Sequence, residues 1–151
     1  MLKRLAKYAA ILIAIIAVGL GFYTWTPNGP ALDGQAIKQA AAPYDVRVIR
    51  DSSGVPHIYG ERDADVAFGL GYAHAEDDFE TIQLVLALSR GKLAEYKGLE
   101  TARTDYLVDL FRVWEDLDAK FEKDLSKDMR AVLDGYVAGL NLYALEHEDE
   151  R

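Results

Sequence analysis

The stretch Val46–Gly98 reads VRVIRDSSGVPHIYGERDADVAFGLGYAHAEDDFETIQLVLALSRGKLAEYKG, and it decides the fold of this chain. Over residues 44–51 apolar side chains recur at every second position, which is the period of a strand with one buried face. Gly54 can take the positive φ that closes a hairpin, and Pro56 lacks a backbone N–H and suits the start or outer edge of a returning strand. The stretch therefore predicts a β-hairpin that ends at Gly60.

A long apolar helical segment follows the hairpin. Asp63 is placed to N-cap this helix, because its side chain can accept hydrogen bonds from the free backbone N–H groups of the first turn. Apolar residues cover every face over Ala64–Ala75, which is typical of a buried helix, and residues 79–88 are apolar again. Gly69 and Gly71 each weaken a helix by about 1 kcal/mol relative to Ala. We therefore expect these glycines to allow close approach to a neighbouring backbone.

Three shorter helical segments are predicted toward the C-terminus. The first, Lys92–Tyr96, is bounded by glycines. The second has apolar residues at helical spacing over 107–121, and the third has them over 129–144, after Ser126 as N-cap. The aromatic residues that these stripes assign to the core are Phe111, Trp114 and Tyr136.

Composition excludes several classes of function. The chain has 151 residues, no cysteine and a net charge of −8. The lack of cysteine rules out a disulfide framework, a thiolate metal site and a cysteine nucleophile in this chain. The acidic balance disfavours nucleic-acid binding, because phosphates would be repelled, and plain solubility accounts for it.

The N-terminus has the features of a membrane or export signal. The 18 residues Tyr8–Trp25 are mostly apolar and uncharged, follow three basic residues, and are just long enough to cross a bilayer core of about 30 Å. Residues 1–25 therefore predict either a retained signal anchor or a cleaved signal peptide. Bulky side chains over 22–26 suit signal peptidase poorly, which favours the anchor. Residues 26–43 are rich in Pro, Gly and Ala and predict a linker, which leaves 44–151 as an incomplete domain.

Three consecutive carboxylates interrupt the apolar helix at Glu76, Asp77 and Asp78. His74 and Asp78 share one helix face, but two ligands fall short of the three protein ligands of a catalytic zinc site. A buried charge requires a partner, so we expect Asp77 to be a buried carboxylate held by an arginine, with Arg50 as the nearest candidate.

His57 lies close in sequence to Ser52 and Ser53, which raises the question of a catalytic pair. A turn serine beside a strand histidine is usually inert, and a base needs both a nucleophile and an orienting partner. The Gly69-x-Gly71 pair lies inside a helix and lacks the third glycine of a dinucleotide fingerprint. The sequence therefore assigns no catalytic, cofactor-binding or metal-binding residue.

Short motifs follow one another in a definite order along Tyr44–Leu145. A strand ends in Arg-Asp and is followed by Gly-Val-Pro-His-Ile, then by a helix with Gly-x-Gly-Tyr-x-x-Ala-Glu-Asp, then by Gly-x-x-Ala-Glu and Gly-Tyr-x-x-Gly-x-Asn. This series resembles the opening of the mature α chain of the penicillin acylase family of N-terminal-nucleophile amide hydrolases. The residues that carry the resemblance are Arg50, Asp51, Gly54, Val55, Pro56, His57, Ile58, Gly69, Gly71, Tyr72, Ala75, Glu76, Asp77, Gly91, Ala94, Glu95, Gly135, Tyr136, Gly139 and Asn141.

The resemblance implies an α+β fold, here a mostly helical fragment with a short N-terminal β-hairpin, belonging to an αββα sandwich. It implies a precursor that cleaves itself into α and β chains, so that the new N-terminal serine of the β chain attacks an amide carbonyl. The self-cleavage site is of Gly-Ser type, and this chain contains no Gly-Ser, Gly-Thr or Gly-Cys pair. The nucleophile, the oxyanion hole and the calcium ligands common in the family are therefore expected beyond Arg151, and the fragment alone is expected to be inactive.

The partners implied are the remainder of the α chain, the β chain and a small amide substrate, such as a β-lactam side-chain amide or an acyl-homoserine lactone. The expected location is the periplasm, where residues 8–25 would anchor the protein in the inner membrane. In the alternative, the segment is cleaved and the protein is secreted. Many family members have an arginine where this chain has Asp78, which leaves the substrate subgroup open. The alternative is a non-enzymatic, membrane-anchored helical module that binds a periplasmic partner. An open reading frame that continues past Arg151 to a Gly-Ser junction would support the enzyme.

Overall fold

The structure, a computed structural model, describes residues 14, 16, 17 and 32–150. The chain divides into two units, Met1–Ala31 and Leu32–Arg151, and the description below concerns the second. The predicted anchor or signal segment, residues 1–25, lies outside the described residues except at positions 14, 16 and 17. Residues 26–31 of the predicted linker also lie outside them. Among the residues described, no helix combines the length and apolar character needed to span a membrane.

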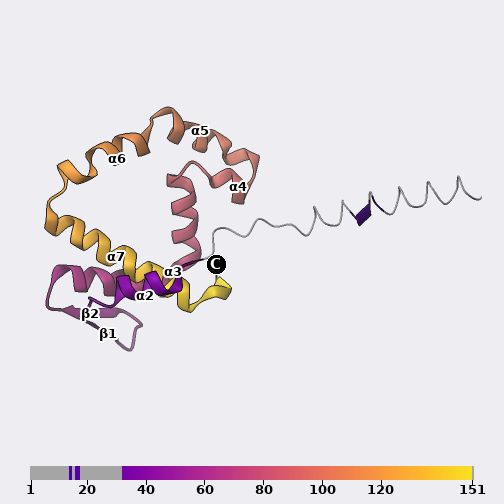
Figure 1. Cartoon of the computed structure of the whole chain (residues 1–151). Coiled ribbons are helices and arrows are strands. Elements are labelled where there is room, and N and C mark those ends of the chain that lie inside the picture. The colour runs from indigo at the N-terminus through magenta and orange to yellow at the C-terminus, as the bar shows by residue number, and fades with distance from the viewer. Residues whose placement is uncertain (1–13, 15, 18–31, 151) are drawn as a thin grey trace, which may run out of the picture. The chain divides into compact units, whose positions relative to one another are not determined.

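The predicted hairpin is confirmed. Strand β1 (Val46–Arg50) pairs antiparallel with β2 (Pro56–Gly60) (Figure 1). In this pairing Val48 lies opposite Ile58. Gly54 has φ 82°, a left-handed conformation that L side chains rarely adopt. One Asp51 carboxylate oxygen accepts hydrogen bonds from the backbone N–H groups of Ser53 and Val55, and these bonds fix the turn.

The long apolar helix is α3 (Asp63–Ser89), and it is kinked at Asp78, whose φ of −159° and ψ of 64° are not helical. The Asp78 side chain accepts a hydrogen bond from Thr81 N, so it caps the second half of the helix. The prediction that Asp63 is the N-cap is wrong. Arg62 holds that position, because the Asp65 side chain reaches back to accept from the Arg62 backbone N–H.

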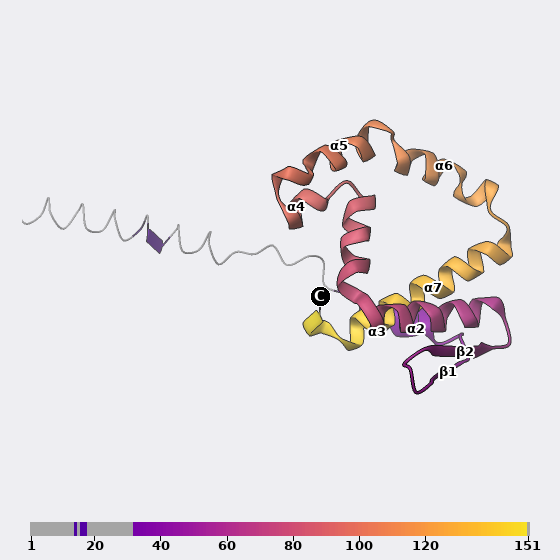
Figure 2. The same cartoon turned by 180° about the vertical axis from the view of Figure 1, so that it is seen from behind.

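Helix α7 (Lys127–Glu146) packs closely along the first half of α3 (Figure 2). Small residues make the approach possible. A Cβ added at Gly71 would overlap the backbone of Tyr136, and a Cβ at Gly139 would overlap the Phe68 carbonyl. The predicted backbone approach is confirmed at Gly71. Gly69 instead makes room for the hairpin, because its added Cβ would meet Val46 and Ile58 side chains.

A helix also lies inside the segment expected to be a linker. Helix α2 (Gly34–Ala41) is N-capped by Asp33, whose carboxylate accepts from Gln35 N and Ala36 N, and it packs on α7. Residues 34–41 of the predicted linker are therefore helical. The alanines that contributed to the linker prediction are strong helix formers. The Asp33 cap and the contact with α7 stabilise them in a helix.

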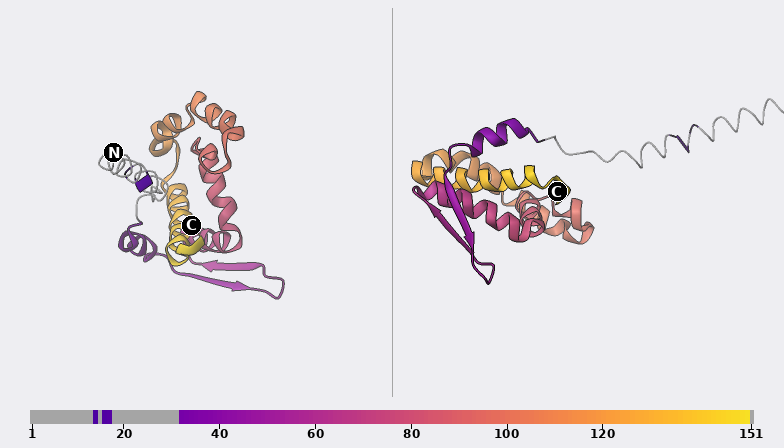
Figure 3. Two further views of the ribbon diagram at one scale, coloured as in Figure 1. Left: turned by 90° about the vertical axis from the view of Figure 1, so that its right-hand side faces the viewer. Right: turned by 90° about the horizontal axis from the view of Figure 1, so that it is seen from below.

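The chain between α3 and α7 leads away from these helices and returns (Figure 3). The single amphipathic helix predicted over 107–121 is two helices, because Arg112 has φ 51° and breaks the helix. Ser126 caps α7 as predicted, by accepting from Met129 N. The remaining elements are α4 (Leu93–Lys97), the 3-10 turn η1 (Leu99–Thr101), α5 (Ala102–Leu110), α6 (Val113–Asp124) and the 3-10 turn η2 (Glu148–Glu150).

The buried core lies where α3 and α7 meet, and the hairpin covers part of α3. We call β1, β2, residues 63–77 of α3, α2 and α7 the packed layer. Helix α6 has no extensive contact with another described element. Phe111, assigned to the core from the sequence, is 70% exposed. Among the described residues, the buried apolar ones are Ala67, Phe68, Ala73, Ala75, Ile82, Ala138 and Tyr143.

Candidate functional site

Arg50 joins the end of the hairpin to the kink of α3. One of its Nη atoms lies 2.5 Å from Glu76 Oε2 and 2.8 Å from Asp77 Oδ1, and the other donates to the Gly54 carbonyl at 2.7 Å. These bonds to Glu76, and then those to Asp77, raise the pKa of the Arg50 guanidinium. The predicted Arg50–Asp77 pair is confirmed, but the prediction that Asp77 is buried is wrong. The Asp77 side chain is 51% exposed, because the carboxylates stand beside the kink at the edge of the packed layer.

The buried carboxylate is Asp65, which the sequence analysis did not single out. Asp65 is 2% exposed, and Arg62 clamps it, with Nη2 2.5 Å from Oδ1 and Nε 2.9 Å from Oδ2. Arg62 also donates to the Pro43 carbonyl at 2.7 Å, so the pair ties the start of α3 to the segment before β1. The hydrogen bonds from Arg62 outweigh the effect of burial and lower the pKa of Asp65 to about 2. A carboxylate in the first turn of the helix, three residues after an arginine, was the available signal.

Neither candidate histidine has the partners of a catalytic base. His57 is half exposed, and its Nε2 lies 3.3 Å from Asp51 Oδ2, so its partner is the carboxylate of the turn and not Ser52 or Ser53. The pKa of Asp51 is lowered, chiefly by the hydrogen bond from the Val55 backbone N–H and then by the bonds to His57 and Ser53.

His74 does not share a metal with Asp78. Its Nδ1 lies 2.6 Å from the Tyr136 hydroxyl on α7, a contact that links the two long helices. Among the described residues no group of three or more His, Cys, Asp and Glu could hold a metal ion. The described residues therefore offer no fitting set of ligands for the calcium that the resemblance implies.

An aromatic cluster closes the far end of the packed layer. The Tyr143 ring stacks on His147 with centroids 4.0 Å apart and meets the rings of Tyr72 and Phe79 edge-on. The Tyr72 hydroxyl donates to Glu146 at 2.8 Å. Burial, and then the hydrogen bond to Glu146, raises the pKa of Tyr72 to about 12, so this phenol stays protonated and can donate to the carboxylate.

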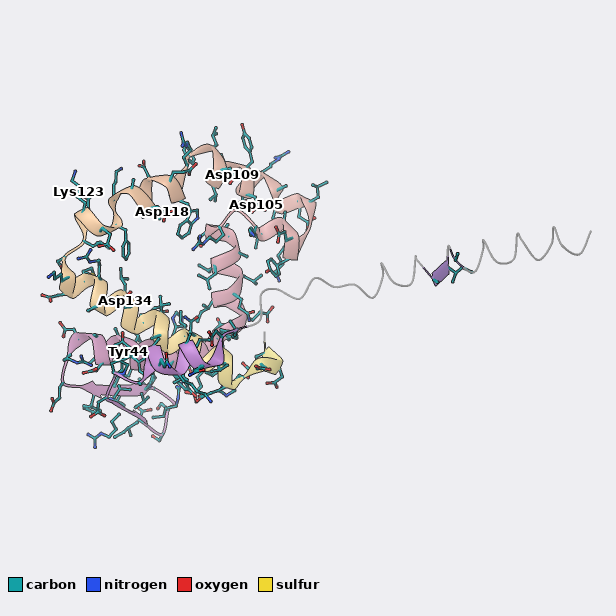
Figure 4. The ribbon with its side chains drawn as sticks, viewed as in Figure 1. Tyr44, Asp105, Asp109, Asp118, Lys123 and Asp134 are labelled. Atoms are coloured by element: carbon teal, nitrogen blue, oxygen red, sulfur yellow. The ribbon has the colours of Figure 1, made fainter. Side chains whose placement is uncertain are left out.

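Other polar side chains cap helices or lie along α5 and α6. Asp105 on α5 accepts from Leu93 N and Ala94 N at 2.9 and 2.8 Å and so holds the start of α4. Figure 4 shows Asp105, Asp109 and Asp118 spread along α5 and α6, and Tyr44 beside the packed layer. The hydrogen bonds and ion pairs of the described residues thus brace the scaffold, and they bring no nucleophile together with a base.

Comparison with known proteins identifies relatives for most of the chain. The family model described as penicillin amidase matches residues 45–151. The Penicillin acylase 2 proenzyme of Pseudomonas sp. (strain SE83) is 36% identical over 115 residues, covering 76% of this chain and 14% of the relative. The acyl-homoserine lactone acylase QuiP of Pseudomonas putida is 28% identical and covers 97% of this chain and 18% of the relative. The chain therefore spans less than a fifth of the length of these curated relatives.

A solved structure has the same arrangement of elements. The thermostable penicillin G acylase from Alcaligenes faecalis superposes with a TM-score of 0.57 at 27% sequence identity, over 70% of this chain and 55% of the solved chain. The expected family, and a mostly helical unit with a two-stranded antiparallel hairpin, are thus confirmed. The homologues are amidohydrolases, as expected of the family, and the chain belongs to the penicillin amidase family.

Proposed function

We propose that residues 44–151 form the N-terminal part of the α chain of an acylase that hydrolyses linear amides of N-acylated small molecules. The observation that carries this proposal is the family match over 45–151 combined with coverage of only 14% of the proenzyme. The same chain covers 55% of the solved penicillin G acylase chain, so that solved polypeptide is much shorter than a whole proenzyme. This difference supports a precursor that is cleaved into separate chains. The αββα sandwich is proposed from the family match.

The chemistry of the reaction is assigned to polypeptide outside these residues. An N-terminal serine would attack the amide carbonyl with its own α-amino group as base, and an oxyanion hole would stabilise the tetrahedral intermediate. The described residues supply the frame, because Arg50 fixes the hairpin to α3 and Arg62 fixes the start of α3 through Asp65. The fragment alone is therefore proposed to be inactive.

The substrates proposed are β-lactam side-chain amides, acyl-homoserine lactones or related acyl amides. The names of the relatives support both of these groups. The proposed location is the periplasm, reached through residues 1–25 as an anchor or as a cleaved signal. The alignment with QuiP supports a shared N-terminal segment, since it takes in 97% of the chain.

A chimera tests the proposed function. The segment of Penicillin acylase 2 proenzyme that matches this chain is replaced by residues 45–151, and gel electrophoresis and hydrolysis of a chromogenic acyl amide report self-cleavage and activity. We expect a cleaved, active chimera, whereas the 151-residue chain alone should give no hydrolysis.

The control chimera receives the matching segment of Escherichia coli penicillin G acylase, which is 28% identical to this chain. Cleavage of the control together with failure of the chimera that carries 45–151 would refute the acylase assignment. That outcome would favour the alternative, a non-enzymatic module that binds a periplasmic partner. Such binding would not require the rest of an acylase.

A further inference from the structure

An uncovered apolar surface runs along α5 and α6. Its members recur at helical spacing, so they share one face of each helix. The break at Arg112 separates the two helices without burying either of them. We call this surface the apolar arch, and it consists of Leu107 (46% exposed), Leu110 (54%), Phe111 (70%), Val113 (40%), Leu117 (47%) and Phe121 (38%).

The arch is hollowed along α6. A groove of about 450 Å³ is lined by Phe111, Val113, Leu117 and Phe121, with Leu125 at the end of the helix. Large apolar side chains that stand together in this way are typical of a surface that another element covers. Side-chain bonds and ring contacts join α6 to other described elements through Trp114 and Glu122. The residues of the arch nevertheless stay 38% or more exposed, so the covering element is not among the described residues.

The charge of the arch restricts what can cover it. The segment 102–125 has seven acidic and four basic residues. Two of its bases are paired inside the segment, Arg112 with Glu115 and Lys120 with Asp116. Asp124 lines the groove and forms no ion pair among the described residues. A second copy of the chain would bring like charges together, and an anionic lipid surface would be repelled as well.

We propose that the apolar arch is the docking surface for an apolar helix of the acylase polypeptide that lies outside this chain, with Lys or Arg at the margin that faces Asp124. This inference rests on the proposed function. The length of polypeptide available supports it, since this chain spans only 14% of the Penicillin acylase 2 proenzyme. The remainder of the acylase covers the arch and completes the hydrophobic core that α5 and α6 begin.

Thiol labelling tests the inference cleanly, because the chain has no cysteine of its own. Leu117→Cys places a thiol in the groove, and Ala119→Cys places one on the opposite face of the same helix, since two residues advance about 200° around a helix. Each variant is made in the full chain and in the chimera with Penicillin acylase 2. Mass spectrometry then follows maleimide labelling at that position.

We expect the thiol at position 117 to react at least about tenfold more slowly in the cleaved chimera than in the full chain, because labelling must await local opening. The thiol at position 119 should react at similar rates in both. A cleaved, active chimera with equal labelling at position 117 would overturn the docking surface while leaving the proposed function intact. A chimera that is not cleaved, beside a cleaved control chimera, would refute the proposed function instead.

Two further outcomes would also overturn the inference. Protection of position 117 in the full chain alone would mean that a second copy or a membrane covers the arch, and sedimentation with and without lipid vesicles separates these two. Equal protection of positions 117 and 119 in the chimera would mean that the covered face is not the arch. The proposed Lys or Arg opposite Asp124 has its own test. In the chimera, Asp124→Lys should make the thiol at position 117 react faster again, because like charges would then face each other. Unchanged protection would refute the proposed basic residue.

Discussion

The packed layer and the apolar arch both carry stripes of apolar residues, yet the packed layer has a buried core and no residue of the arch is buried. Ala138 on α7 is 7% exposed, whereas Leu117 on α6 is 47% exposed. The difference lies in the partner. Glycines on α3 and α7 let the two backbones approach, and no described element faces α6 in the same way. An amphipathic stripe therefore indicates that a face is to be covered, and the covering surface can lie on another part of the polypeptide.

The largest effect is expected where the packed layer is tightest. Gly139→Leu would place a side chain against the Phe68 carbonyl, where even a Cβ overlaps backbone. We expect a loss of about 3 kcal/mol in the free energy of unfolding, because overpacking forces the helices apart. Denaturant titration followed by circular dichroism measures it. The control is Val137→Leu on the same helix, half exposed, which should change little. Equal stability of both variants would mean that the layer is not close-packed at this crossing.

The next effect concerns the buried carboxylate. Arg62→Ala leaves Asp65 buried without its main partner, and we expect the melting temperature at pH 7 to fall by several degrees. Arg130→Ala is the matched control, since Arg130 pairs with Glu122, which is 84% exposed. A fall no larger than that of the control would show that the Arg62–Asp65 pair does not support the packed layer.

The same carboxylate gives a pH dependence. The pKa of Asp65 is lowered from 3.8 to about 2, so its ionised form stabilises the fold above pH 3.8 and this contribution is lost as pH falls toward 2. Melting temperatures of the natural chain and of Asp65→Asn should therefore differ most at pH 5 and converge toward pH 2. Parallel curves across this range would contradict the assignment.

A smaller and more local effect is expected at the edge of the packed layer. Arg50→Ala removes the bonds to Glu76, Asp77 and the Gly54 carbonyl, all of them at the surface. Hydrogen exchange at the β1 and β2 amides should become faster while the amides of α7 keep their protection. Arg50→Lys keeps the charge but not the several donors, so it should restore the protection only in part. Unchanged exchange in the hairpin would remove Arg50 from its role as the link.

The smallest effect on stability is expected in the arch. Leu117→Gln replaces a half-exposed side chain, so the free energy of unfolding should change by no more than about 0.5 kcal/mol. The tendency of the chain to aggregate should nevertheless fall, because an exposed apolar patch is interrupted. Light scattering and denaturant titration measure the two quantities. A large loss of stability would show that α6 is packed within this chain and would end the contrast between the two regions.

Local features were predictable from the sequence because they depend on neighbouring residues. The hairpin was predicted from alternation, Gly54 and Pro56, and the start of α7 from Ser126. The single helix over 107–121 was a wrong prediction, because apolar spacing continues through the break at Arg112.

The candidate site shows the same limit. Arg50 was correctly paired with Asp77 because the hairpin brings the end of β1 to the kink of α3. The burial expected for Asp77 belongs instead to Asp65, since the exposure of a carboxylate depends on which elements pack around it. The pattern of carboxylates along α3 does not by itself say which of them is buried, and the spacing of Arg62 and Asp65 was the one available signal.

The sequence by itself determined the family, the hairpin, the helical stripes and the need for Gly71 at a close approach, because motif order, turn chemistry and side-chain size are local properties. Only the tertiary structure decided that α2 is a helix on α7, that Asp65 is the buried charge among the described residues and that no described element covers the arch. A side chain is buried only when another surface packs against it. The sequence of one segment specifies the surface of that segment, but not which other surface covers it.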